Sequence, residues 1–422
     1  MTNQRGITCL TSLFLILLIT ACGRGGSSGP VTPAPVTIKV SPAFSSVMLG
    51  NDLQFEATGN YNDGSTKDLT LSVEWSSSNE RMATIGNSGV ATPLATGGVT
   101  ISAALGGVTG STLLAITGNA SARLVWFTPD VGGTDMLRLF SQPEEWPNAR
   151  ASVQVFKFYT GQLYPPPYSC GGCGQNTEPN LASAGAFSKL NQWGLDIGIE
   201  AAAVVQWGCT ADVTSSAAKQ AIQAVQSNGG VVSYLAMDEP FIHGQSCNYT
   251  MQQSATQTAQ FVKLMHASNP TLQIGDIEPY PYFLEPQLES WITTLQADGV
   301  NLPFFHLDVD RAAVAAFGTN VTSDLQLLSS FCESRGIPFG VIFINETTFS
   351  TQELSDQDYY DSTMLWIQTV KSAIGMPQHS IFQSWTTNGD GLLDIPINLP
   401  ENDPTIYSHT RLINEGLAAL SH

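Results

Sequence analysis

Two patterns of apolar and polar residues divide the chain. In residues 38–118 the two kinds alternate in short runs such as Leu53–Ala57 and Val99–Ala103. Turn signals rich in Gly, Asn and Asp separate these runs at intervals of about 10 to 15 residues. Because alternate side chains of a strand share one face, this segment is predicted to form a small antiparallel β-sandwich.

From residue 119 to residue 422, strand-like runs alternate with amphipathic, helix-like stretches. The eight predicted strands are Leu124–Thr128, Val153–Tyr159, Asp196–Ala202, Val231–Met237, Gln273–Ile277, Phe304–Val309, Phe339–Ile344 and Ser380–Trp385. Predicted helices between them include Ser215–Gln226, Ser254–Ala267, Ser323–Arg335 and Gln357–Ala373. This alternation favours parallel pairing, so the segment is predicted to be an α/β (β/α)8 TIM barrel. A doubly wound sheet is the alternative, but no Gly-rich phosphate loop follows the first strand.

The sandwich segment resembles the bacterial Ig-like domain of group 2. Its matching motifs are Leu49-Gly50, Tyr61–Thr66, Trp75–Asn79, Ala83–Ile85 and Gly97–Ile101. The resemblance implies a spacer or adhesive module. The chain is therefore predicted to be multidomain, with an Ig-like domain over residues 38–118 and the barrel over residues 119–422.

The N-terminal residues carry an export signal. Arg5 precedes a short apolar run, Leu10–Ile19, which is too short to cross a bilayer. The run ends in Ile19-Thr20-Ala21-Cys22, which resembles a bacterial lipobox and implies removal of residues 1–21 and lipidation of Cys22. Residue 24 is Arg, not an Asp that would resemble an inner-membrane retention signal, so we expect anchoring at the outer membrane or cell surface. An ordinary signal peptide, with Cys22 incidental, is the alternative. Residues 22–37 are Gly/Ser/Pro-rich and are predicted to form a tether.

Composition narrows the classes of protein further. Charged residues are only 12% of the 422 residues, about half the usual share, while apolar residues are 42%. This balance excludes a disordered chain and a coiled coil, and it is typical of an exported protein. The net charge of −19 argues against nucleic acid as a partner, because an acidic surface repels phosphates.

The cysteines favour disulfide formation in an oxidising compartment. Of the seven, Cys9 is lost with the signal peptide and Cys22 to lipidation, which leaves five. We expect the pairs Cys170–Cys173 and Cys209–Cys247, and a buried free thiol at Cys332. A zinc half-site at Cys170-Gly-Gly-Cys173 is the alternative, but the sequence offers no second half-site and no metal is predicted.

Acidic residues follow most of the predicted barrel strands, where barrel enzymes carry their active sites. They are Asp130, Glu200, Asp238-Glu239, Asp276, Glu278, Asp308, Asp310 and Glu346. The sharpest motif is Asp238-Glu239-Pro240, directly after an apolar strand. Pro240 is expected to hold Glu239 in the β/PPII region and to direct it from the barrel rim. A helix N-cap by Asp238, or a salt bridge, is the structural alternative.

Glu239 and Glu346, after the fourth and seventh strands, resemble the catalytic pair of retaining glycosidases on (β/α)8 barrels. The resemblance implies that Glu239 is the acid/base, Glu346 the nucleophile, and Trp385 a sugar-stacking floor. Asp238 departs from the pattern, since many members carry Asn there. An alternative role for Glu346 is a cap for the following helix.

Substrate-binding residues are predicted at the same strand ends. They are Asp238, Glu278, Asp308, Trp126, Trp207, Tyr280 and Trp385, with core packing as the alternative for the aromatic ones. The predicted function is hydrolysis of a carbohydrate substrate without a cofactor or an obligate protein partner, and with membrane attachment through Cys22. Two alternatives stay open: a hexosaminidase-type enzyme in which Asp238 orients a substrate acetamido group and Glu239 is the acid, and a non-catalytic glycan-binding or adhesion lipoprotein.

Overall fold

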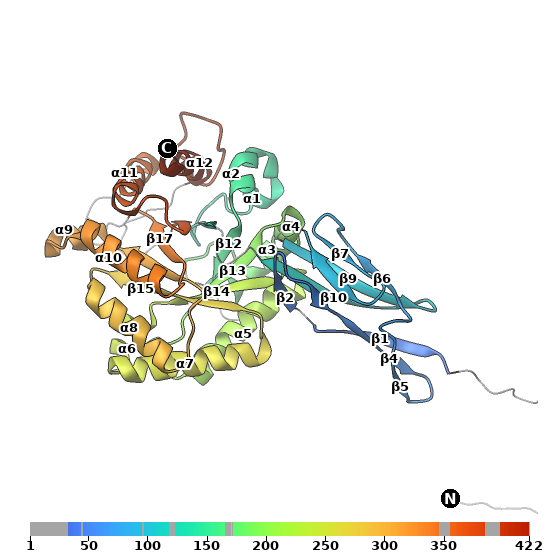
Figure 1. The fold of residues 1–422 in the computed structure, drawn as a ribbon. Coiled ribbons are helices and arrows are strands. Elements are labelled where there is room, and N and C mark those ends of the chain that lie inside the picture. Colours follow the sequence, from blue (N-terminus) through green and yellow to red (C-terminus); the bar gives the residue numbers. More distant parts are fainter. Residues whose placement is uncertain are drawn as a thin grey trace, which may run out of the picture.

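The computed structural model describes residues 33–43, 45–94, 97–117, 123–164, 170, 172–345, 355–384 and 397–421. Figure 1 shows an N-terminal all-β domain beside a closed eight-stranded barrel with surrounding helices. The predicted fold class, an Ig-like sandwich followed by a TIM barrel, is confirmed. No helix of the described residues is long and apolar enough to cross a membrane.

The N-terminal domain is built from mostly antiparallel strands around one small core, and β2 pairs with β10 in parallel instead of antiparallel as predicted. Its strands are β1 (Pro35–Ser41), β2 (Ser45–Met48), β3 (Leu53–Gln54), β4 (Glu56–Tyr61), β5 (Thr66–Asp68), β6 (Glu74–Ser77), β7 (Ala83–Ile85), β8 (Val90–Pro93), β9 (Gly97–Leu105) and β10 (Val108–Thr117). They form sheets in the orders β1-β4-β5, β2-β10-β9-β6 and β3-β8-β7. Phe55, Ile101 and Leu114 are fully buried between them, as the alternating pattern predicts.

Eight parallel strands close the barrel in sequence order. They are β11 (Leu124–Thr128), β12 (Val155–Tyr159), β13 (Asp196–Ala201), β14 (Val232–Asp238), β15 (Gln273–Tyr280), β16 (Phe305–Val309), β17 (Phe339–Phe343) and β18 (His379–Gln383). Each coincides with a predicted strand to within a few residues. The largest difference is at β15, which continues to Tyr280 rather than ending at Ile277.

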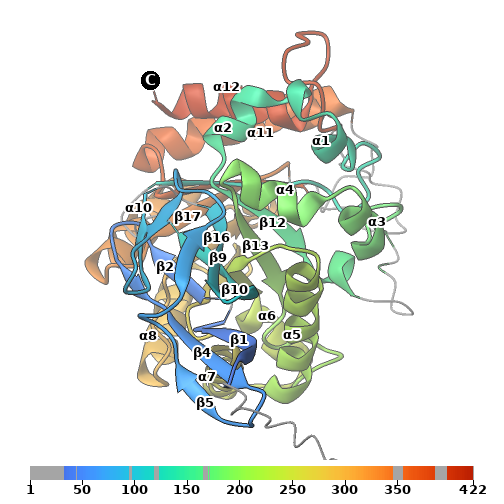
Figure 2. The same ribbon diagram turned by 90° about the vertical axis from the view of Figure 1, so that its right-hand side faces the viewer.

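Helices surround the barrel, and Figure 2 shows α11 and α12 lying together with α1 and α2 on one side. The α-helices are α1 (Arg138–Ser141), α2 (Pro147–Ser152), α3 (Glu178–Ser183), α4 (Ala186–Trp193), α5 (Ala211–Ser227), α6 (Pro240–Ser246), α7 (Met251–Ser268), α8 (Glu285–Ala297), α9 (Arg311–Phe317), α10 (Val321–Ser334), α11 (Asp356–Ile374) and α12 (His409–Ser421). Two 3-10 turns, η1 (Pro143–Glu145) and η2 (Thr160–Leu163), complete the described helical segments.

An aromatic layer fills the lower part of the barrel lumen. The fully buried Trp126 ring lies within 6 Å of rings from other parts of the barrel wall, those of Tyr234, Phe304, His306 and His379. His306 Nε2 and His379 Nδ1 lie 2.8 Å apart. Burial lowers the pKa of both imidazoles, so this layer is uncharged at neutral pH.

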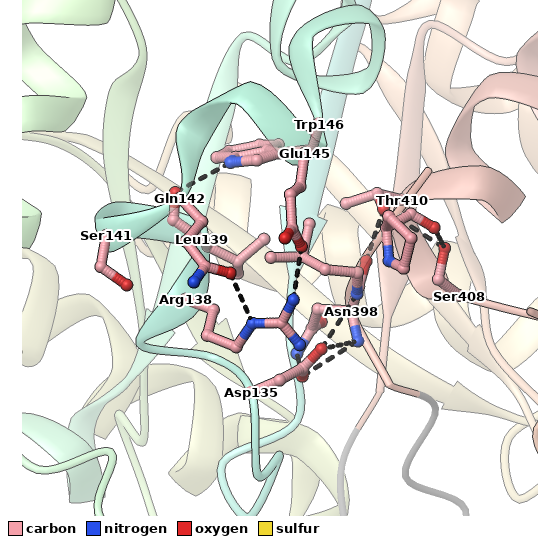
Figure 3. Close-up of polar contacts among 12 residues, drawn as sticks. Asp135, Arg138, Leu139, Ser141, Gln142, Glu145, Trp146, Asn398, Ser408 and Thr410 are labelled. Atoms are coloured by element: carbon pink, nitrogen blue, oxygen red, sulfur yellow. Dashed lines mark hydrogen bonds and ion pairs between the residues drawn. The ribbon is translucent and has the colours of Figure 1, made fainter. Parts of the chain in front are cut away.

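The connections after the first and last barrel strands are joined by buried hydrogen bonds (Figure 3). Asp135 accepts from the backbone N–H groups of Asn398 (2.9 Å) and Leu399 (3.0 Å). Glu401 accepts from the N–H groups of Asn148 (2.9 Å) and Ala149 (2.8 Å) at the start of α2. The C-terminal segment is thereby fixed against the first strand-to-helix connection of the barrel.

The Ig-like domain packs against α4 at the side where the barrel strands begin (Figure 1). Gly98 of β9 is so close to Asn191 that a Cβ added at Gly98 would lie 2.7 Å from Asn191 Cγ. Asn191 in turn donates to the carbonyl of Gly229, just before β14 (2.8 Å). The carboxyl ends of the strands therefore face away from the Ig-like domain.

Candidate active site at the carboxyl ends of the barrel strands

The aromatic layer identifies which side chains enter the lumen. Trp126 contacts rings from across the barrel, and a Cβ at Gly198 would lie 3.1 Å from it, so these positions point inward. Strand side chains alternate between the two faces. The polar side chains at the inward positions nearest the carboxyl ends are therefore Thr128, Lys157, Tyr159, Glu200, Asp238, Asp308 and Gln383. This set defines the lumen site, which holds three carboxylates and one lysine, and the lysine is paired with Glu200.

Lys157 is the buried cation of the lumen site. Its side chain is fully buried, forms an ion pair with Glu200, and donates a hydrogen bond to Gln383 Oε1 (2.6 Å). Burial raises the pKa of Glu200, the Lys157 ammonium opposes that rise, and the charge of Asp238 adds to it. Three strands, β12, β13 and β18, are thus joined by one charged network near their carboxyl ends.

Tyr159 lies above this network and donates to the carbonyl of Ser384 (2.9 Å). Burial raises its pKa well above the ordinary value, and the charges of Glu200, Asp130 and Asp308 raise it further. Asp130 accepts from the N–H of Gly132 (2.5 Å) directly after β11. The Tyr159 phenol therefore stays neutral beside these three carboxylates, which lie at or near the ends of β11, β13 and β16.

Glu239 has an unusual backbone conformation at the end of β14. It adopts φ 45° and ψ 51°, and Asn248 is the only other non-glycine of the described residues with a positive φ. The prediction that Pro240 holds Glu239 in the β/PPII region is wrong. Proline disfavours the right-handed helical region for its predecessor, and the left-handed region turns the chain from strand to helix within one residue. The Glu239 N–H still donates to Ile277 O (3.1 Å), and its carbonyl accepts from the N–H of His243 (3.0 Å).

Glu278 and Tyr280 lie on the helix-facing side of β15 instead of in the lumen. The prediction ended this strand at Ile277, but its continuation puts Asp276, Glu278 and Tyr280 on one face. Glu278 is fully buried and accepts from the N–H of Phe241 in α6 (2.7 Å). Tyr280 donates to Asp324 of α10 (2.7 Å). These positions contradict the expectation that the two residues bind substrate.

Buried carboxyl groups cluster around Glu278. Burial raises its pKa well above the ordinary value, and Asp276 and Glu239 raise it further by like-charge repulsion. Burial also raises the pKa of Asp276 to about 8, although that carboxylate accepts from Trp291 Nε1 (2.7 Å). Glu278 is thus held as a neutral acid behind Glu239, where it fixes the start of α6.

The remaining predicted site residues divide into three groups. Trp126 is fully buried in the aromatic layer, so it packs the core and does not form a sugar platform. Asp238 and Asp308 are half-buried in the lumen site, and Trp207 is 61% exposed on the loop between β13 and α5. Glu346, Trp385 and Cys22 lie outside the described residues.

The described cysteines form two disulfides, Cys170–Cys173 and Cys209–Cys247, and Cys332 is a buried free thiol. Within the described ranges, no group of three or more His, Cys, Asp or Glu side chains is arranged to hold a metal.

Arg311 of α9 binds the two residues that follow β17. Its guanidinium donates hydrogen bonds to Ile344 O (3.1 Å) and Asn345 Oδ1 (3.0 Å). The residue before Glu346 is therefore held in place.

Sequence reasoning missed Lys157, Tyr159 and Gln383. The available signal was the composition of the second strand, Val155–Tyr159, in which Lys157 is the single charged residue among apolar and aromatic ones. A lysine at an inward strand position is costly to bury unless it is paired. That cost indicates a carboxylate partner, but the sequence does not say which strand provides it.

Comparison with known proteins identifies the N-terminal domain. Residues 35–115 match the bacterial Ig-like domain (group 2). The chain is also 44% identical over 89 residues to Ice-binding protein 1 of Shewanella frigidimarina, a match that covers 21% of this chain and 10% of that protein. The chain thus spans about a tenth of the length of this curated relative.

Solved structures similar to the barrel include enzymes of more than one kind. A glucosidase from Croceicoccus marinus has 13% identity and a TM-score of 0.44, over 71% of this chain and 68% of that one. The Ignisphaera aggregans GH53 catalytic domain has 10% identity and a TM-score of 0.42, over 63% and 85%. QR15, an aldolase, has 9% identity and a TM-score of 0.35, over 63% and 90%. At these values the similarities assign no activity.

Proposed function

We propose that this chain is an exported glycoside hydrolase in which Glu239 is the general acid/base. The observation that carries the proposal is the conformation of Glu239, a non-glycine residue in the left-handed region at the carboxyl end of a barrel strand. Such backbone strain is concentrated at functional sites, where the surrounding structure maintains it. Barrel enzymes carry their chemistry at this edge.

The proposed reaction proceeds in two steps. The Glu239 carboxyl gives its proton to the glycosidic oxygen while the Glu346 carboxylate attacks the anomeric carbon, so the glycosidic C–O bond breaks and a glycosyl ester forms. Glu239 then removes a proton from water, which attacks the anomeric carbon and releases Glu346. Asp238 and Asp308 in the lumen site accept hydrogen bonds from sugar hydroxyls.

Export supports this assignment and is part of the proposal. The lipobox-like motif at Cys22 predicts a lipid anchor at the outer membrane or cell surface. Two disulfides fit an oxidising compartment. An enzyme anchored in this way, with an Ig-like spacer, would have access to extracellular polysaccharide. The proposed reaction uses no cofactor and no protein partner.

The first test is replacement of the two carboxylates. Glu239→Gln and Glu346→Gln should each fold and lose at least about 10³-fold in turnover of the substrate found by polysaccharide screening. The control is Glu333→Gln, an exposed glutamate of α10, which should keep full turnover. Unchanged turnover in either catalytic variant refutes that residue's role.

One observation favours a second mechanism. Asp238 is half-buried in the lumen site beside Glu200, a position from which it can orient a substrate acetamido group. In that mechanism the acetamido oxygen replaces Glu346 as the nucleophile. Activity restricted to N-acetylated sugars, together with full activity of Glu346→Gln, would identify it.

A further inference from the structure

A surface groove lies outside the lumen, against the exposed face of α5. It has a volume of about 670 Å³, and Trp207 and Tyr164 contribute its aromatic lining. Val213 adds an aliphatic surface, and Asp212, Ser216 and Gln220 add polar groups along the helix. The loop that carries Trp207 leaves β13 directly after Glu200-Ala201, so the groove adjoins the carboxyl ends of the barrel strands.

Trp207 is exposed, yet its loop is firmly held. Val205 and Gly208, on either side of it, exchange two backbone hydrogen bonds (2.8 and 3.4 Å). The Cys209–Cys247 disulfide ties the loop to the end of α6, and Tyr249 Oη donates to Cys209 O (3.0 Å). Because the loop is already ordered in the free protein, a ligand that stacks on the indole ring binds with little further loss of conformational entropy in the loop.

The lining chemistry specifies the ligand. An indole face packs against the C–H groups of a pyranose. The carboxamide and the hydroxyl can donate hydrogen bonds to its hydroxyl groups or accept hydrogen bonds from them, and the carboxylate can accept hydrogen bonds from them. The described lining contains one carboxylate and no cation, which disfavours anionic ligands. We infer that this groove is a second carbohydrate-binding site, which holds a neutral polysaccharide on the outside of the barrel near the active face.

A protein partner fits the groove less well. Trp207 and Val213 are the exposed large apolar residues of its described lining, whereas Leu365, Phe317 and Leu327 lie on other helices. A stable protein interface buries about 800 Å² on each partner around a continuous apolar centre. The described lining has no such apolar centre, since Asp212, Ser216 and Gln220 lie beside Trp207 and Val213.

The experiment is affinity gel electrophoresis of the full mature, oxidised chain in gels that contain mixed-linkage β-glucan, arabinoxylan, galactomannan or β-1,4-galactan, with polygalacturonate as the anionic comparison. At least one neutral polymer should retard the chain. Trp207→Ala should weaken that retardation at least about tenfold. Ala217→Arg, which fills the groove and leaves the indole in place, should weaken it as well. Leu365→Ala, an equally exposed apolar residue on α11 (63%), should have no effect.

The inference is overturned if no neutral polymer retards the chain, or if Trp207→Ala and Ala217→Arg bind like the unchanged protein. It is also overturned if light scattering shows a dimer that Trp207→Ala converts to monomer, since the groove would then be a protein interface. The site does not depend on the proposed hydrolysis. Glu239→Gln should be retarded like the unchanged chain, and a chain that binds but never cleaves would refute the hydrolase alone.

Discussion

At the scale of single residues, the carboxyl end of the barrel separates its carboxyl groups by environment. Glu200 faces the lumen and is paired with Lys157. Glu278 and Asp276 face the helices and are held in their neutral forms by burial. Glu239 directly follows β14 in the strained conformation that motivates the proposed function, and its charge raises the pKa of Glu278. For the acids within strands, Glu200, Asp276 and Glu278, the alternation of side chains along the strand determines whether they face the lumen or the helices.

The buried Asp276 predicts how stability changes with pH. Burial raises its pKa from the ordinary value of 3.8 to about 8, so between these values the folded state binds more protons than the unfolded state. The free energy of unfolding must therefore fall as the pH rises from about 4 to 8, by at most about 1.4 kcal/mol per pH unit for one group.

Urea unfolding at several pH values measures this effect. Asp276→Asn keeps an oxygen that accepts from Trp291 Nε1 and removes the titration, so its stability should depend less on pH over this range. An identical pH dependence in both proteins would show that Asp276 is not the group responsible.

At the scale of elements, most of the barrel was predictable and one strand end was not. Apolar runs bounded by turn residues identified all eight strands, because a parallel strand buried on both faces leaves a continuous signal. The predicted strand ended at Ile277, yet β15 continues to Tyr280. The three additional residues put Glu278 and Tyr280 on the same strand face as Asp276, so both side chains lie in the helical layer and not in the predicted site.

The lumen site was predicted less completely than the strands. The acids at Asp238, Glu239 and Asp308 follow apolar runs, so sequence alone indicates them. The Lys157–Glu200–Gln383 network joins residues that are far apart in the chain, and only closure of the barrel brings them together. Pairing across a lumen depends on register and closure, which no local pattern encodes.

The link between β15 and α6 provides a prediction at this scale. Glu278 accepts from the first N–H groups of α6, so Glu278→Ala leaves buried donors unpaired and should lower the free energy of unfolding by about 2 kcal/mol. Glu278→Gln retains an acceptor and should remain within about 0.5 kcal/mol of the unchanged protein. Chemical denaturation measures both variants, and equal losses would contradict the capping role.

At the scale of the whole molecule, the Ig-like domain contacts one end of the barrel. It packs on α4 at the side where the strands begin, so the carboxyl ends of the strands face away from the Ig-like domain (Figure 1). A lipid-anchored chain arranged in this way directs its candidate active site away from the tether. With the lipid anchor that we propose at Cys22, the domain would act as a spacer with a defined orientation.

Gly98 tests this contact, because even one methyl group at this position meets Asn191. Gly98→Ala should weaken the domain contact by about 1–3 kcal/mol and separate the unfolding of the two domains in calorimetry. Gly86→Ala in the same domain is the control, since its new Cβ would lie 3.8 Å from the nearest atom. Adding Asn191→Ala to Gly98→Ala should restore part of the loss, and no difference between the two glycine variants would contradict a close-packed contact.

The central claim is that Glu239 donates a proton to the leaving group of a glycoside. The most direct measurement compares Glu239→Gln with the unchanged chain on aryl glycosides whose phenols differ in acidity, with the sugar chosen from the screen. A weakly acidic leaving group needs the proton, so turnover should fall at least about 10³-fold there and far less with a strongly acidic phenol. An equal loss with every leaving group, or no loss, would contradict the assignment of Glu239 as the general acid.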